Sequence, residues 1–353
     1  MSRYLKQQYQ KLEAYTPGEQ PRDMQYIKLN TNESPYPPAP SVVAALDGGE
    51  VEALRLYSDP TAKGLKEKLA GLYGVESENI FLSNGSDDIL NFAFMAFGAD
   101  GVLFPDITYG FYPVFAELHG ISYKEMPLKA DFTVNKEDYI AKNQLIVIAN
   151  PNAPTGISLP LSAIEEIVKS NPDHVVVIDE AYVDFGGKSC YKLIETYDNL
   201  LVVRTFSKSR CLAGGRLGYA IGPRGLIDDL EKIKYSTNPY NINRLTMRLG
   251  EATVDAEDYD QEKCRKIIEV REQTAERLQE LGFAVLPSDA NFIFAKSTRI
   301  GGETLYNELK KRGILVRHFT KERIKGFNRI TIGTREQMDV FCRTVAEILE
   351  EQA

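Results

Sequence analysis

The chain has 353 residues, more than the roughly 250–300 at which a single hydrophobic core stops growing, so we expect one large and one smaller domain. Its 43% hydrophobic and 26% charged residues are typical of a globular protein, and the net charge of −8 argues against binding to nucleic acid or an anionic membrane. Four scattered cysteines and three distant histidines argue against a disulfide framework or a metal site, and the absence of long apolar runs predicts a cytoplasmic protein.

The predicted elements begin with an N-terminal arm, residues 1–35, that joins the small domain. The proline-rich segment at residues 32–40 can form neither a helix nor a central strand. From about residue 60, helices at 64–73, 87–97, 109–118 and 162–170 alternate with strands at 79–83, 101–104, 122–126, 145–149, 174–179, 200–205 and 217–221. This alternation predicts an α/β large domain, residues 36–238, with a mostly parallel central sheet covered on both faces.

The remaining chain, residues 239–353, is predicted to form a smaller α+β domain. Near the boundary the sequence favours charged amphipathic helices at 225–235, 244–254 and 259–281. Strands are expected at 283–287, 292–295, 314–317 and 329–332, with a final helix at 335–350. Strands grouped beside helices, without strict alternation, indicate a separate α+β unit.

Ligands of open parallel sheets bind beyond the carboxyl ends of the strands, and polar residues gather there in this sequence. They lie at residues 83–87, 150–152, 179 and 205–208. Lys208 comes just after the strand at 200–205, where a desolvated amine could lose its proton and form an imine with an aldehyde. A lysine exposed after a strand is the alternative.

Arg216 follows eight residues later, after a glycine pair that permits a tight turn. A guanidinium group binds phosphate bidentately, and the Ser207 hydroxyl can add a donor, although an arginine can also simply cap the strand edge. Gly85, Ser86 and Asp87 begin a helix, where free amides form an anion site or, equally, an ordinary N-cap.

Asp179 ends a buried strand, where an ionised carboxylate needs a cationic partner. That partner is either a pyridinium nitrogen or a nearby arginine. Tyr182, three residues on, could hydrogen-bond the ring oxygen of the same group, and Tyr109 is either a stacking ring or a core aromatic. An imine-forming lysine, an acid for a ring nitrogen and a cation for a phosphate together describe pyridoxal 5′-phosphate.

These motifs resemble those of the fold type I pyridoxal-phosphate-dependent aminotransferases over nearly the whole chain. The Lys208…Arg216-Leu217-Gly218 segment, residues 179–182 and residues 150–156 stand in the family's order. The segments at 15–21, 29–35, 56–60 and 328–336 are similar to those of the histidinol-phosphate aminotransferase branch. The resemblance implies a fold type I transferase with a large cofactor-binding domain and a smaller α+β domain.

Carried over by position, the resemblance makes Lys208 the imine lysine and places the cofactor phosphate among Ser207, Arg216 and the amides of residues 85–87. Tyr57 would reach the phosphate in the partner subunit of a homodimer with a shared active site. Arg317, Arg329 and Tyr15 match substrate-binding residues, whereas the residues alone identify Arg317 and Arg329 only as strand arginines.

One position departs from the family pattern. Two adjacent asparagines usually precede Pro-Thr-Gly, and the second bonds the ring oxygen of the cofactor, but this chain has Asn152 followed by Ala153. Either Asn152 takes over that bond or Tyr182 makes it alone.

The activity that the resemblance implies is amino transfer from L-histidinol phosphate to 2-oxoglutarate, giving glutamate, in histidine biosynthesis. The kinetics would be ping-pong through a Lys208 aldimine. Asp179 would stabilise the carbanion through the ring nitrogen, and Tyr182 would hydrogen-bond the ring oxygen. An aromatic aminotransferase or a threonine-phosphate decarboxylase would use almost the same cofactor residues. A pyridoxal-phosphate-binding regulator is disfavoured for two reasons. The chain is acidic, and the predicted alternation of helices and strands begins by residue 60, which leaves no room before it for a DNA-binding module.

Overall fold

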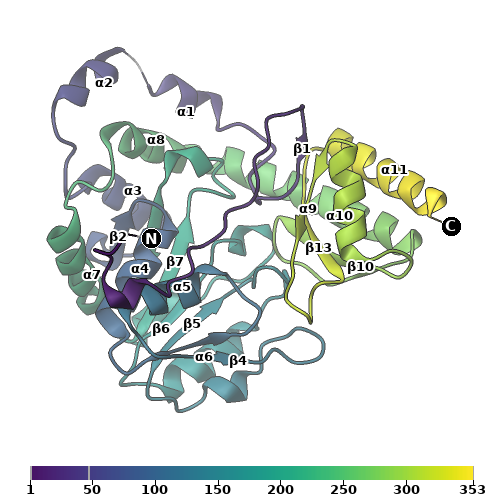
Figure 1. Ribbon diagram of the computed structural model, residues 1–353. Coiled ribbons are helices and arrows are strands. Elements are labelled where there is room, and N and C mark those ends of the chain that lie inside the picture. Colours follow the sequence, from purple (N-terminus) through teal and green to yellow (C-terminus); the bar gives the residue numbers. More distant parts are fainter. Residues whose placement is uncertain (1, 47, 353) are drawn as a thin grey trace.

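The computed structural model describes residues 2–46 and 48–352. Within them, the large domain is built on a seven-stranded sheet (Figure 1), with the order β2 (Ile80–Ser83), β8 (Gly218–Ile221), β7 (Leu200–Thr205), β6 (Val176–Asp179), β5 (Leu145–Ala149), β3 (Val102–Pro105) and β4 (Tyr123–Met126). The strands from β7 to β4 are parallel, and β8 is antiparallel to both of its neighbours. The mostly parallel sheet predicted from the sequence is confirmed.

Helices cover both faces of this sheet because its strands are apolar on both sides. Successive residues of a strand point to opposite faces, and all residues of β5, β6 and β7 are buried. One face packs on α3 (Lys63–Tyr73), α6 (Leu161–Ser170) and α8 (Arg244–Val254). The other packs on α4 (Ser86–Phe97), α5 (Phe111–His119) and α7 (Arg224–Thr237).

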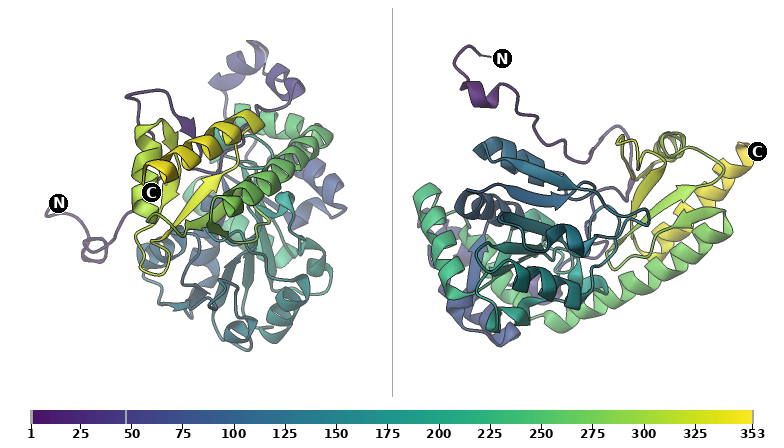
Figure 2. Two further views of the ribbon diagram at one scale, coloured as in Figure 1. Left: turned by 90° about the vertical axis from the view of Figure 1, so that its right-hand side faces the viewer. Right: turned by 90° about the horizontal axis from the view of Figure 1, so that it is seen from below.

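The small domain has an antiparallel sheet in the order β12 (Arg317–His318), β13 (Phe327–Thr331), β10 (Phe292–Ser297) and β9 (Phe283–Val285). Its core also includes α9 (Glu257–Glu280), α10 (Gly302–Lys311) and α11 (Arg335–Glu351). A capping box of Thr334 and Gln337 begins α11. Figure 2 shows the long α9 leading from the large domain into this unit.

The N-terminal arm is attached to the small domain by β1 (Ile27–Lys28), which pairs in parallel with β11 (Ile314–Leu315). Two short helices follow the arm, α1 (Pro40–Ala44) and α2 (Gly48–Glu52). Turns of 3-10 helix lie at Gln7–Tyr9, Ala53–Arg55, Ser77–Asn79, Lys136–Tyr139, Val183–Phe185, Tyr191–Glu195 and Ala213–Gly215. The domain limits at residues 35 and 238 stay predictions, although α8, beyond the second limit, packs on the large-domain core.

Two elements differ from the sequence prediction in ways that affect the site. The strand expected at 314–317 is divided between β11 and β12, which belong to different sheets, because β11 pairs with the arm. The helix expected from residue 109 begins at Phe111, so Tyr109 lies in the preceding loop. Among the described residues, every helix is too short or too polar to cross a lipid bilayer.

Candidate active site

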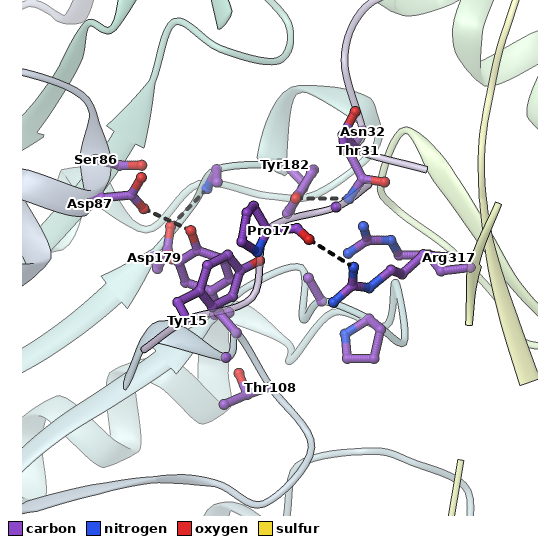
Figure 3. Close-up of a pocket in the computed structure, with 18 of the residues that line it drawn as sticks. Tyr15, Pro17, Thr31, Asn32, Ser86, Asp87, Thr108, Asp179, Tyr182 and Arg317 are labelled. Carbon is purple, nitrogen blue, oxygen red and sulfur yellow. Dashed lines mark hydrogen bonds between the residues drawn. The ribbon is translucent and has the colours of Figure 1, made fainter. Parts of the chain in front are cut away.

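A cavity of about 650 Å³ lies where the large domain, the small domain and the arm meet (Figure 3). It is found at the carboxyl ends of β6 and β7, as expected for an open parallel sheet. The residues predicted from the sequence that line it are Tyr15, Ser86, Asp87, Tyr109, Asp179, Tyr182, Ser207, Lys208, Arg216, Arg317 and Arg329. These residues come from positions far apart in the chain, so the fold brings most of the predicted site together.

The N-terminus of α4 and Arg216 form an anion cradle at one end of the cavity. Gly85 is the N-cap residue at φ 88°, and its lack of a side chain leaves the first helical N–H groups free for a ligand. A Cβ atom on Gly85 would lie 2.6 Å from Arg216 Nη2, and one on Gly218 would lie 2.4 Å from the Gly85 carbonyl carbon. Gly218 therefore requires glycine because backbone atoms leave no room, and Gly85 because of its positive φ. Arg216 Nη2 is 3.2 Å from Asp87 Oδ2.

Lys208 follows β7 and faces the cavity. Its Nζ donates a hydrogen bond of 3.2 Å to the Thr31 carbonyl oxygen of the arm. Burial, with a smaller contribution from the Arg329 charge, lowers the pKa of Lys208 to about 8. A substantial fraction of the amine is therefore neutral near physiological pH, as a nucleophile or general base requires.

Asp179, at the end of β6, is the buried acid of the site and is 5% exposed. Its Oδ2 accepts a hydrogen bond of 2.9 Å from Tyr112 Oη, and its Oδ1 accepts one of 3.2 Å from the Ala181 N–H. Burial raises the pKa of Asp179 to about 6, against the opposing effect of the Tyr112 hydrogen bond. A cationic ring nitrogen beside this carboxylate would remove the cost of its burial.

Two tyrosines stand near these charged groups. Tyr109 Oη donates to Asp87 Oδ1 at 2.8 Å, and burial raises the pKa of Tyr109, so it remains a neutral ring. The Tyr182 ring centroid lies 5.8 Å from Lys208 Nζ, and Tyr182 Oη accepts a hydrogen bond of 2.9 Å from Asn32 Nδ2. Figure 3 shows this last contact on the arm side of the cavity.

The far side of the cavity carries two arginines in direct cross-strand register. Arg317 on β12 pairs with Arg329 on β13, an arrangement of like charges that is unfavourable without an anion. Arg317 donates to the Thr16 and Pro17 carbonyls at 3.4 Å, and Arg329 donates to the Asn30 carbonyl at 3.0 Å.

Tyr15 completes this anion-binding side. Its ring stacks on Phe111, with the centroids 4.1 Å apart. Burial raises the pKa of Tyr15, while the charges of Arg317 and Arg329 oppose the shift. A protonated hydroxyl and two guanidinium groups are a suitable donor set for a phosphate or carboxylate.

Two predicted residues lie away from the cavity. The Asn152 amide is used within its own loop, since it donates to the Ile107 carbonyl at 2.9 Å and to Thr155 Oγ1 at 3.0 Å. Its Oδ1 accepts from Thr108 Oγ1 at 2.9 Å, so Ala153, not Asn152, faces the cavity. Tyr57 is 80% exposed and stacks on Tyr240 outside the cavity, so within one chain it does not reach the site.

Sequence reasoning missed Tyr112 and Asn32, and it placed Thr205 at the strand end without giving it a role. Tyr112 stands three residues after Tyr109, a helical spacing that could have suggested a second inward-facing tyrosine. Thr205 Oγ1 donates to Ser207 Oγ at 3.0 Å and holds the turn after β7. Asn32 belongs to a loop whose partners are distant in sequence, and local pattern gives no signal for its role.

The residues present fit a phosphorylated pyridine aldehyde. The α4 amides and Arg216 suit its phosphate, Asp179 suits its ring nitrogen, and Lys208 suits its aldehyde. Among the described residues, no group of three or more histidine, cysteine or acidic side chains is placed to hold a metal ion.

Comparison with known proteins gives full-length matches to aminotransferases. The model of the family "Aminotransferase class I and II" matches residues 24–345. The histidinol-phosphate aminotransferase of Brachyspira hyodysenteriae is 50% identical, over 99% of this chain and 100% of that protein. Histidinol-phosphate aminotransferase 1 of Hydrogenovibrio crunogenus is 49% identical, over 100% of this chain and 99% of that protein.

Solved structures share the fold. The crystal structure of the histidinol-phosphate aminotransferase from Clostridium acetobutylicum has a TM-score of 0.85 and 25% identity, covering 92% of this chain and 99% of that one. The enzyme from Sinorhizobium meliloti in complex with pyridoxal-5′-phosphate has a TM-score of 0.83 and 24% identity, covering 93% and 92%.

The fold and the matched family together define the protein as a class I and II aminotransferase, which confirms the predicted fold class and enzyme class. Within that class, the full-length similarity to named relatives shows that the chain belongs to the histidinol-phosphate aminotransferase family.

Proposed function

We propose that the protein transfers the amino group of L-histidinol phosphate to 2-oxoglutarate, with pyridoxal 5′-phosphate as its cofactor, in histidine biosynthesis. The observation that carries the proposal is the single cavity in which Lys208, Asp179 and the N-terminus of α4 meet. The full-length similarity to histidinol-phosphate aminotransferases supports the choice of substrate.

The cofactor residues divide by the part of the cofactor that they hold. The amides at the start of α4, with Ser207 and Arg216, bind the phosphate. Asp179 would stay ionised and pair with the ring nitrogen, Tyr109 would stack on the ring and Tyr182 would donate to the ring oxygen; all three line the cavity. When bound, the cofactor supplies an aldehyde that bonds amines and a ring that accepts an electron pair.

Lys208 has two tasks in this proposal. Its Nζ would hold the cofactor through the aldehyde group, and a substrate amine would take its place there. Once free, the Nζ would act as the general base that takes the proton from the substrate carbon carrying the amine, and as the general acid that gives it back. A pKa of about 8 keeps this nitrogen able to do both. The keto acid then uses the same residues in reverse, which gives ping-pong kinetics.

Tyr15, Arg317 and Arg329 bind the anionic groups of the substrates. The opposed guanidinium groups gain most from a group with two negative charges, because one anion relieves their mutual repulsion. This feature favours a phosphorylated amine, and the carboxylates of 2-oxoglutarate can use the same donors.

A comparison of amino donors with 2-oxoglutarate as acceptor tests the proposed substrate. We expect kcat/KM for L-histidinol phosphate to exceed that for L-histidinol by about 10- to 10²-fold, since a hydrogen bond to a charged group contributes about 1.5–3 kcal/mol. Glutamate formation measures the rate for both compounds.

The rival activities would give different results in that assay. An aromatic aminotransferase would prefer phenylalanine to L-histidinol phosphate. A threonine-phosphate decarboxylase would release carbon dioxide from threonine phosphate and form little glutamate. Either pattern would contradict the proposed substrate while leaving the cofactor site intact.

We also propose a homodimer in which Tyr57 enters the active site of the partner. The 80% exposed Tyr57 and the exposed apolar side chains beside it, Val51, Leu54 and Leu56, support a covered surface here. Mixing inactive Lys208→Ala chains with impaired Tyr57→Ala chains should restore activity, because each hybrid dimer contains one intact site. Subunit exchange without recovery would contradict the shared site.

A further inference from the structure

The loop at residues 150–156 leaves one cofactor contact unfilled. Ala153 presents a methyl group to the cavity, and the neighbouring Asn152 amide is fully used by Ile107, Thr108 and Thr155. The ring oxygen of the cofactor can therefore receive no amide donor from this loop. Tyr182 is the side chain left for that bond, and its hydroxyl must be held with its proton directed at the cavity.

We infer that Asn32 of the arm is a positioning residue that makes Tyr182 a hydrogen-bond donor to the cofactor ring oxygen, in place of the amide that Ala153 lacks. The inference rests on the proposed function. It assigns a task to the buried Asn32 that local sequence did not suggest.

The orientation of the Asn32 amide is fixed by its surroundings. Asn32 is 1% exposed and adopts φ 55°, a left-handed conformation that asparagine tolerates. Its backbone N–H donates to Thr331 Oγ1 at 3.0 Å, and that hydroxyl donates back to Asn32 Oδ1 at 2.9 Å. The Asn291 amide also donates to the Asn32 carbonyl at 3.0 Å. Because Oδ1 is occupied by the threonine proton, Nδ2 is the end that faces Tyr182.

This orientation determines what Tyr182 can do. Tyr182 Oη accepts from Asn32 Nδ2 at 2.9 Å, so its own proton is free to point elsewhere. Burial raises the pKa of Tyr182, against the opposing effects of Arg329 and the Asn32 hydrogen bond, so the hydroxyl keeps that proton at neutral pH. The Tyr182 ring is held edge-on against Phe292, with centroids 5.1 Å apart, and Tyr182 lines the cavity together with Asn32 and Lys208.

The test is a pH titration of the visible absorbance band of the lysine-bound cofactor in wild type and Asn32→Gly. A donor to the ring oxygen withdraws negative charge that would otherwise stabilise the proton on the Lys208 nitrogen. Losing the donor should raise the midpoint by about 0.5–1 pH unit, the size of one hydrogen bond. Glycine tolerates the φ of 55° and introduces no charge.

Four further variants separate positioning from a general structural effect. Tyr182→Phe should raise the midpoint similarly, and the Asn32→Gly/Tyr182→Phe pair should add little beyond it, because both act through one bond. Ala153→Asn should lower the raised midpoint of Asn32→Gly by supplying a new amide. Asn30→Gly is the matched control, since this equally buried asparagine donates to Glu19 and not to Tyr182, and it should leave the midpoint unchanged.

The melting temperature of the cofactor-free protein checks folding in each case. If Asn32→Gly does not fold, Thr331→Val, which frees the amide to rotate, should raise the midpoint in the same direction. A midpoint that moves by less than about 0.2 unit in the folded variant, or shifts of Asn32→Gly and Tyr182→Phe that simply add, would overturn the inference alone. No visible band in the wild type would overturn the proposed function, and the inference with it.

Discussion

Lys208→Ala is expected to lower kcat/KM for amino transfer by at least about 10³-fold, because the variant loses both the amine that bonds the cofactor and the proton carrier. The purified variant should also lack the visible absorbance band of the lysine-bound cofactor. Steady-state glutamate formation and the absorbance spectrum measure the two effects. Wild-type turnover in this variant would contradict the role of Lys208.

A second buried lysine provides the matched control. Lys234 on α7 is 1% exposed, pairs with Glu231 at 3.1 Å and does not line the cavity. Lys234→Ala should lower thermal stability while the visible band persists.

In wild-type protein the capture of added cofactor should accelerate as pH rises through about 8, because the neutral amine is the nucleophile and the pKa of Lys208 is about 8.

Asp179→Asn should lower kcat by about 10²–10³-fold, the usual effect of removing a preorganised electrostatic contact. The substitution keeps the shape and one acceptor oxygen, and it removes the negative charge that would pair with the ring nitrogen together with one of the hydrogen bonds from Tyr112 and Ala181. The cofactor should also bind more weakly, which an equilibrium titration of the cofactor-free protein measures. Tyr112→Phe, which keeps the charge, should have a smaller effect on kcat.

Asp179→Asn is also expected to change how the folding stability of the cofactor-free protein depends on pH. The pKa of Asp179 is raised from its ordinary 3.8 to about 6, so its stabilising contribution to the cofactor-free protein is greatest below pH 3.8 and is lost as the pH rises through 6. Asp179→Asn should therefore be relatively more stable than wild type at pH 7–8, and this advantage should disappear on acidification toward pH 4. Equal stability of the two proteins across that range would contradict the burial cost.

Much of the fold followed from local pattern because the central strands are uniformly apolar. The apolar runs at 174–179 and 200–205 were predicted as buried strands, and their carboxyl ends placed Asp179 and Lys208 at the ligand-binding edge of the sheet. The split of residues 314–317 between two sheets was not predictable, because it depends on β1, nearly three hundred residues away in sequence.

The parts of the site that escaped prediction depend on contacts that no local pattern encodes. Asn32 is oriented by Thr331, at the opposite end of the chain. Asn152 matched a family position, but its amide is used inside its own loop. Tyr57 is exposed on a single chain, and its proposed task involves a second subunit.

The most direct test of the account is a single half-reaction. The purified protein carrying its cofactor is mixed with L-histidinol phosphate in a stopped-flow spectrophotometer, with no keto acid present. We expect rapid loss of the visible band of the lysine-bound cofactor, formation of the aminated cofactor, and reversal on addition of 2-oxoglutarate. A band that stays unchanged with this substrate but is converted by phenylalanine would contradict the proposed function.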